Sequence, residues 1–352
     1  MTATEVLTQT EQLYTEELAA LTPDSFRQAL LDIHNDVIPE QHLDAFDAYN
    51  NFMGLSSKQT NELEGVEVRF PRREDKAEVL EFALVKAQSC EDPRNGAMLL
   101  SAAVLLVHPF NDGNGRTSRA LYSKLSGVDR LDESSRDGDG TGSSNLSNRE
   151  HIDLGSAFSS DPKVSALTEL LTYRAKGIPK RDIRTLSHRP DVDDQIESAR
   201  LTDDELEGFS DSERADFIEA LGLDKSGNND NWDMRGMGFA SAVLLYKYPE
   251  LETLVTTPDA SVDEASDGRE LLNIHDLLPK LSAEQKSEYV ASLWEYRKLR
   301  AMAAIDMLSD DAGSILLTGR MGSIALRDVV IESTNNFVSS TIPSDHAAWS
   351  SR

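Results

Sequence analysis

The sequence predicts an all-α fold that carries one small β-hairpin. Along most of the chain, apolar residues recur at intervals of three and four, the spacing that places them on one face of a helix. Helix-start signals of the types Ser-x-x-Glu, Ser-x-x-Gln and Asp-Pro precede several of these runs. Clear alternation of apolar and polar residues, which indicates a strand, occurs in VEVRF at residues 66–70.

The first helix is expected to begin near Asp24 or Ser25, either of which can cap it. Its apolar residues fall on one stripe, namely Phe26, Ala29, Leu30, Ile33 and Val37. A short helix is expected over residues 42–52. The alternating segment 66–70 stops at Pro71 and predicts a short strand or hairpin arm.

Three further helices are expected in the first half of the chain. Helical spacing returns at residues 74–88, and Asp92 before Pro93 starts the next helix. Its residues 98–107, MLLSAAVLLV, are apolar nearly all round, which predicts a place at the centre of a bundle. The helix ends at His108, because Pro109 prevents its continuation. The third helix is expected over residues 114–126, with Gly127 as its C-terminal cap.

The composition changes sharply after this helix. Residues 132–148 are rich in Gly, Ser and Asp and cannot support a packed core. We therefore expect a domain at 1–128 with its core at about 24–127, a flexible linker or loop at 129–150, and a mainly helical carboxy-terminal region at 151–352. In that region, capping boxes begin at Ser210 and Ser282.

Composition also restricts the partners and the compartment. The chain has 62 acidic and 35 basic residues, a formal charge of -27, which disfavours nucleic acid and anionic lipid as partners. Neither a signal peptide nor a membrane-spanning apolar stretch is apparent, so no membrane association and a cytoplasmic location are expected. The single cysteine, Cys90, agrees with a reducing compartment. One nucleotide could still bind, since it needs only a local group of amides and arginines.

The segment HPFNDGNGRTSR, residues 108–119, has the composition of an anion-binding site. Gly113 and Gly115 lack Cβ atoms, so their backbone amides can approach phosphate oxygens closely. The start of the helix adds a favourable dipole. Arg116 and Arg119, three residues apart, project from one face of that helix and can both bind the phosphates of one nucleotide.

Two other residues of the segment suit chemistry at phosphate. Asp112 supplies a hard oxygen ligand of the kind that binds Mg²⁺ together with substrate phosphates. His108 is the nearby side chain whose ordinary pKa suits proton transfer at neutral pH. Phe110 is expected to anchor the loop in the core.

The segment resembles the active-site motif of Fic-domain AMP transferases, HPFx(D/E)GNGRxxR. The resemblance implies a Fic-type helical bundle with a β-hairpin flap, and transfer of AMP from ATP to a Tyr, Thr or Ser hydroxyl of a target protein. It further implies that His108 is the general base and that Asp112 binds the Mg²⁺ that bridges the α- and β-phosphates. The phosphate-binding residues that it implies are Gly113, Asn114, Gly115, Arg116 and Arg119.

Other activities stay open at this point. The related Doc-type kinases carry alanine and lysine where this chain has Gly113 and Gly115, which favours AMP transfer here. Ser118 stands where many family members have glycine. The alternatives are a related Fic phosphotransferase or de-AMPylase, and a nucleotide-binding adaptor without transferase activity.

The resemblance also implies where partners bind and how the enzyme is restrained. The target protein would dock on the flap at residues 66–74 by strand addition. Residues 60–65 fit the inhibitory pattern (S/T)xxxE(G/N), but only Gly65 separates Glu64 from the expected flap strand, so we expect Glu64 to lie outside the phosphate site. Restraint would then come from the carboxy-terminal region or from a separate inhibitory protein.

Several other polar residues are expected to have no site function. A group of basic residues is interpreted as a solvated face: Arg174, Lys176, Lys180, Arg181 and Arg184. The histidines outside the motif show no metal-ligand spacing and are expected at the surface or in packing, among them His34, His188 and His275.

Overall fold

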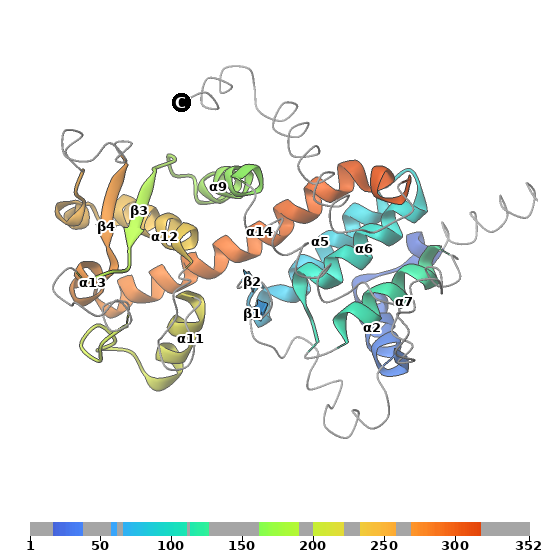
Figure 1. The fold of residues 1–352 in the computed structure, drawn as a ribbon, viewed down its shortest axis with the longest axis horizontal. Coiled ribbons are helices and arrows are strands. Elements are labelled where there is room, and N and C mark those ends of the chain that lie inside the picture. The colour runs from blue at the N-terminus through green and yellow to red at the C-terminus, as the bar shows by residue number, and fades with distance from the viewer. Residues whose placement is uncertain are drawn as a thin grey trace, which may run out of the picture. The chain divides into compact units, whose positions relative to one another are not determined.

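The computed structural model describes residues 17–37, 58–61, 66–110, 113–126, 162–189, 200–221, 233–257 and 269–317. The chain divides into two compact units: one is Met1–Leu167 with Arg300–Arg352, and the other is Thr168–Leu299. Helices dominate the described residues (Figure 1), so the prediction of an all-α fold is confirmed. The expected short helix at 42–52 and the expected linker at 129–150 lie outside the described residues.

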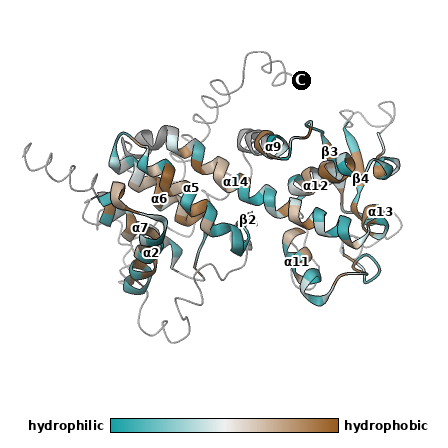
Figure 2. Cartoon of the chain, turned by 180° about the vertical axis from the view of Figure 1, so that it is seen from behind, coloured by the Kyte–Doolittle hydropathy of each residue, from teal (hydrophilic) through white to brown (hydrophobic). Residues whose placement is uncertain are grey.

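The first unit is a small helical bundle with one hairpin. Its elements are α2 (Pro23–Val37), β1 (Lys58–Asn61), β2 (Val66–Arg69), η1 (Arg73–Asp75), α5 (Lys76–Gln88), α6 (Pro93–Val107), α7 (Asn114–Ser126) and the end of α14 (Ala283–Leu317). Helix α6 packs against both α5 and α7. Figure 2 shows hydrophobic residues concentrated on α6, and the buried Leu100, Ala103 and Val104 lie in its middle. The predicted central position of this helix is confirmed.

The start of α2 differs from the prediction. The Ser25 backbone N–H donates to Thr22 Oγ1 at 3.2 Å, and the Thr22 N–H donates to Ser25 Oγ at 2.8 Å. Thr22 is therefore the capping residue, and the expected cap at Asp24 or Ser25 is wrong by two or three residues. The physical reason is Pro23, which has no N–H to satisfy and a φ already suited to the first helical position.

The alternating segment forms a hairpin, as predicted. β2 pairs antiparallel with β1, with Lys58 opposite Arg69 and Asn61 opposite Val66. The hairpin leads through Phe70, which is buried, and η1 into α5. The segment after the hairpin is therefore fixed to the bundle.

The first unit also contains chain from far along the sequence. Residues from 300 onward belong to it, and Ala303, Ala304 and Ile305 of α14 are buried. Lys86 of α5 forms an ion pair with Asp306 of α14. The sequence composition did not predict that the end of α14 belongs to the first unit. A change in composition indicates a loop but does not indicate which helices pack together.

The second unit has its own core. Its elements are most of α9 (Pro162–Lys176), β3 (Ile183–Leu186), α11 (Asp211–Leu221), α12 (Met234–Lys247), η3 (Pro249–Leu254), β4 (Glu270–Asn273), α13 (Ile274–Leu277), η4 (Leu278–Lys280) and the first part of α14. β3 and β4 pair in parallel. The largest core side chains include Phe217, Phe239, Tyr289, Trp294 and Tyr296.

The capping boxes predicted in this unit are present. Ser210 Oγ accepts from the Glu213 N–H at 3.4 Å, and Glu213 Oε2 accepts from the Ser210 N–H at 2.8 Å. Ser282 and Gln285 make the same pair of bonds, at 3.3 and 2.8 Å, before α14. In these two places a local sequence signal was sufficient to locate a helix start.

The basic group of this unit is only partly a solvated face. Arg174 and Arg184 are exposed, as expected. Lys176 pairs with Glu295 at 2.5 Å, and Arg181 binds both Glu252 and Glu270. For Lys176 and Arg181 the prediction is wrong, because carboxylates distant in sequence lie close enough to neutralise them.

Among the described residues, no helix has the length and apolar character needed to cross a membrane.

Gly238 of α12 packs directly against the backbone of β3, and this contact gives the first prediction. A Cβ atom there would lie 2.5 Å from the Ile183 carbonyl oxygen of β3. Because that neighbour is backbone and cannot rotate away, we expect Gly238→Ala to lower the free energy of unfolding by about 2 kcal/mol. Urea denaturation measures the change, with Met234→Ala as a control on the exposed start of the same helix. Unchanged stability in Gly238→Ala would contradict this close packing.

Candidate functional site

The motif lies at the turn between α6 and α7 of the first unit. His108 directly follows α6, and its N–H donates to the Val104 carbonyl at 2.9 Å, which completes the last helical turn. Its φ of 52° makes it the one non-glycine with positive φ among the described residues. A left-handed residue ends the helix and redirects the chain into the turn.

The segment that follows the hairpin contacts both the ring and the backbone carbonyl of His108. The His108 ring stacks on the Phe70 ring, with centroids 4.5 Å apart and planes 19° apart. The His108 carbonyl oxygen accepts a hydrogen bond from Lys76 Nζ at 2.8 Å. Phe70 and Lys76 are both buried.

The turn itself is closed by Asn114. Its Oδ1 accepts from the Phe110 N–H at 2.9 Å, and its Nδ2 donates to the Phe110 carbonyl at 2.7 Å. The Phe110 ring is fully buried and stacks on His34 with centroids 3.9 Å apart. The side chain of Asn114 is thus engaged within the turn.

The start of α7 has the features expected of an anion-binding helix end. Gly113 has a φ of 78°, a conformation that favours glycine, and its carbonyl accepts from the Thr117 N–H at 2.8 Å. The backbone N–H groups of the first turn of an α-helix point away from the helix and are suited to bind an anion, and in α7 these belong to Asn114, Gly115 and Arg116. Arg116 is half-buried, and Arg119 lies one turn further along α7.

Asp112, the expected magnesium ligand, lies outside the described residues, between Phe110 and Gly113. Among the described residues, no group of three or more His, Cys, Asp or Glu side chains could hold a metal ion. A magnesium ion that binds with a nucleotide does not need such a group, because it takes one or two carboxylates together with phosphate oxygens and water.

Comparison with known proteins gives one match. The model of the Fic/DOC family matches residues 24–126. This stretch is therefore similar to Fic domains. No curated protein and no solved structure matches the chain. The match spans α2 to α7, and so contains the hairpin, the motif turn and the residues that pack around them.

Ser118, which departs from the common motif, has a structural role in the matched stretch. Ser118 Oγ donates to the Ser101 carbonyl at 2.8 Å, and Ser101 Oγ donates to the Ser118 carbonyl at 2.8 Å. Both residues are buried. These two hydrogen bonds join the middle of α6 to α7. Glycine at position 118 would keep the bond to its carbonyl but would lack the hydroxyl that donates the other.

The inhibitory pattern at 60–65 does not coincide with a helix. Thr60 and Asn61 are the last two residues of β1, and Glu64 lies in the connection to β2, outside the described residues. In the family pattern these positions belong to an inhibitory helix, so a strand at Thr60 argues against that use of Glu64.

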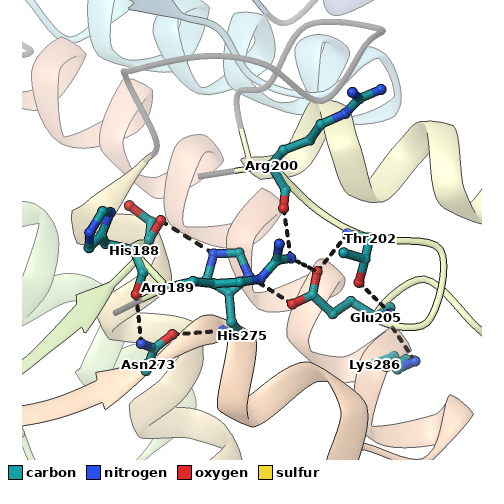
Figure 3. A network of polar contacts seen from close by, with 9 residues as sticks. His188, Arg189, Arg200, Thr202, Glu205, Asn273, His275 and Lys286 are labelled. Atoms are coloured by element: carbon teal, nitrogen blue, oxygen red, sulfur yellow. Dashed lines mark hydrogen bonds and ion pairs between the residues drawn. The ribbon is translucent and has the colours of Figure 1, made fainter. Parts of the chain in front are cut away.

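The second unit contains a buried polar network that sequence reasoning missed (Figure 3). His275 Nδ1 lies 2.7 Å from Glu205 Oε1, and Glu205 Oε2 accepts from Arg189 Nη2 at 2.7 Å and from the Thr202 N–H at 2.6 Å. Burial alone would raise the pKa of Glu205, but the hydrogen bonds from His275, Thr202 and Arg189 outweigh it and lower the pKa to about 2. The contact between His275 and Glu205 joins residues 70 positions apart, so no local sequence signal predicts it.

Proposed function

We propose that the Fic domain is a protein adenylyltransferase that moves AMP from ATP to a Tyr, Thr or Ser hydroxyl of a target protein and releases pyrophosphate. Fic domains are in general enzymes that transfer nucleotide-derived groups to proteins. The observation that supports this function best is the turn, in which a histidine at the end of α6 and the amino terminus of α7 come together. Asn114 ties Phe110 to the start of α7, and His108 is only two residues, at most about 7 Å, from Phe110.

The reaction needs a base on one side of phosphorus and anion stabilisation on the other. The target hydroxyl oxygen attacks the α-phosphorus, the bond to the β-phosphate oxygen breaks, and pyrophosphate leaves with that electron pair. His108 takes the hydroxyl proton. The backbone N–H groups of Gly113, Asn114 and Gly115 and the guanidinium groups of Arg116 and Arg119 stabilise the phosphate charge, so catalysis rests on positioning and electrostatics.

Asp112 would hold the magnesium ion that binds together with ATP. Asp112 immediately precedes Gly113 at the start of α7, next to the amides proposed to bind phosphate. When bound, Mg²⁺ would neutralise part of the phosphate charge.

The Mg²⁺ assignment gives the second prediction. We expect Asp112→Ala to weaken binding of Mg²⁺-ATP and to lower turnover together, because one carboxylate is a large share of the protein's ligands to such an ion. Titration of activity against magnesium concentration measures the effect. A mutant with the same magnesium dependence as the parent would remove Asp112 from the metal site.

The hairpin is the proposed docking surface for the target. β1 and β2 form a two-stranded sheet within the described residues, and an extended target segment can add to such a sheet by backbone hydrogen bonds. Residues 66–74 then lead directly to Lys76, which contacts His108. A docked segment would therefore lie near the residue that activates its hydroxyl.

The direct test compares ATP labelled at the α-phosphate with ATP labelled at the γ-phosphate, each incubated with this protein and a cell lysate. Protein label from the α position alone supports AMP transfer. Label from the γ position indicates a phosphotransferase, and removal of AMP from a modified protein indicates a de-AMPylase. ATP binding with no label from either position indicates the adaptor.

The third prediction concerns restraint of the enzyme. We expect Glu64→Gly to change turnover by less than about threefold, because Thr60 of the same pattern lies on strand β1 and not on an inhibitory helix. Initial rates of α-label incorporation for mutant and parent provide the measurement. Activation of the mutant by about tenfold or more would make Glu64 an inhibitory residue. With similar rates, the carboxy-terminal region or a separate inhibitory protein would be left as the source of any restraint.

A further inference from the structure

Lys76 is the first residue of α5, and its side chain is completely buried, at 0% exposure. Burial of an ammonium group is costly unless the group is hydrogen-bonded. Lys76 Nζ donates to the His108 carbonyl oxygen at 2.8 Å, across 32 residues of sequence. The buried charge is therefore directed at the backbone of the motif histidine.

The backbone of His108 needs such support. With a φ of 52°, His108 is in the left-handed region, which is unfavourable for a residue with a Cβ atom. This conformation persists in folded proteins only where the surroundings hold it. A charge-assisted hydrogen bond to the carbonyl of the same residue is a strong restraint of this kind.

The ring of His108 is restrained from the same segment. Phe70, which follows β2, stacks on it with ring centroids 4.5 Å apart. The segment 70–76 thus contacts the carbonyl of His108 through Lys76 and the imidazole through Phe70. Stacking alone would leave the backbone of His108 free to rotate and to carry the ring with it.

We propose that Lys76 is a positioning residue for His108: its ammonium holds the His108 carbonyl, and so keeps the imidazole aimed at the target hydroxyl. The role in turnover rests on the proposed adenylyltransferase function. Loss of the ammonium should lower kcat, because small displacements of a catalytic group reduce the rate strongly. It should leave ATP affinity nearly unchanged, because the proposed phosphate ligands belong to the start of α7.

The test uses the full-length chain with Lys76→Met, which keeps most of the apolar stem and removes the donor. We expect kcat for AMP transfer to fall by about ten- to a hundredfold, while the Kd for ATP changes by less than about twofold. Lys124→Met, an exposed lysine on α7, is the control for the chemical change. Leu84→Ala, a buried residue of α5, is the control for loss of stability. Should Lys76→Met fail to fold, Lys76→Gln, which keeps a shorter neutral donor, replaces it.

A second readout does not depend on catalysis. In protein labelled with ¹³C in its 7 histidines, the His108 ring signal is assigned by its absence in His108→Gln, and the other six serve as internal references. We expect Lys76→Met to move the His108 ring signal and Lys124→Met to leave it in place. If the parent transfers no AMP, the proposed function is wrong, and the ring signal still decides the positioning role. The proposal would be overturned if Lys76→Met left the His108 ring signal in place. It would also be overturned if Lys76→Met lowered kcat no more than Leu84→Ala does when the two variants have equal thermal stability.

Discussion

His108→Ala is expected to lower AMP transfer by about 10²–10⁴-fold, the range typical of a lost general base. The histidine ends α6 and contributes no backbone N–H to the start of α7, since its N–H donates to the Val104 carbonyl. The amides and arginines proposed to bind ATP therefore stay in place, and the Kd for ATP should change by less than about twofold. Single-turnover transfer of α-label and equilibrium binding of ATP measure the two effects separately.

The matched control is His188→Ala, which removes an exposed imidazole from the second unit. His188→Ala should leave both the rate of AMP transfer and the Kd for ATP unchanged. If His108→Ala retained most of its transferase activity, another group would have to accept the proton. A parallel loss of ATP binding would instead show that the His108 ring supports the turn as well as the chemistry.

Glu205→Ala is expected to destabilise the second unit by about 3 kcal/mol, because it leaves the buried partners of a charge network without their carboxylate. Glu205 is the common partner of His275, Arg189 and the Thr202 N–H. Urea denaturation followed through the fluorescence of the buried Trp294 measures the change. Glu284→Gln, at an exposed position of α14, is the control and should change stability by less than about 0.5 kcal/mol.

The same network predicts how stability depends on pH. The pKa of Glu205 is lowered from 4.5 to about 2, so the folded state binds this proton less readily than the unfolded chain does. The stabilisation is therefore fully present above about pH 4.5 and is lost as the pH falls toward 2. In Glu205→Ala, the free energy of unfolding should therefore depend less on pH between about 4.5 and 2 than it does in the parent. Identical acid dependence in mutant and parent would contradict the assignment.

Local signals predicted most elements of the first unit but not what surrounds its motif. Asp92 before Pro93 correctly located α6, and α7 runs over the expected residues 114–126. These features depend on neighbours within one or two helical turns. The contact between Lys76 and His108 joins residues that only the tertiary fold brings together, and a lone lysine at a helix start gives no sign of burial. The turn was predicted to bind anions, whereas the use of the Asn114 side chain to close it appeared only in the structure.

The placement of the end of α14 in the first unit has a consequence for protein synthesis. The first unit is discontinuous, with residues 168–299 inserted between its two parts. During translation all of the inserted unit leaves the ribosome before Ile305 and Leu308, which are buried in the first unit. Domains fold as units once their residues are available, so the second unit can complete its core first, and the first unit completes its core only when the later chain has been made. A nascent or truncated chain that stops before residue 300 therefore lacks part of the core of the first unit.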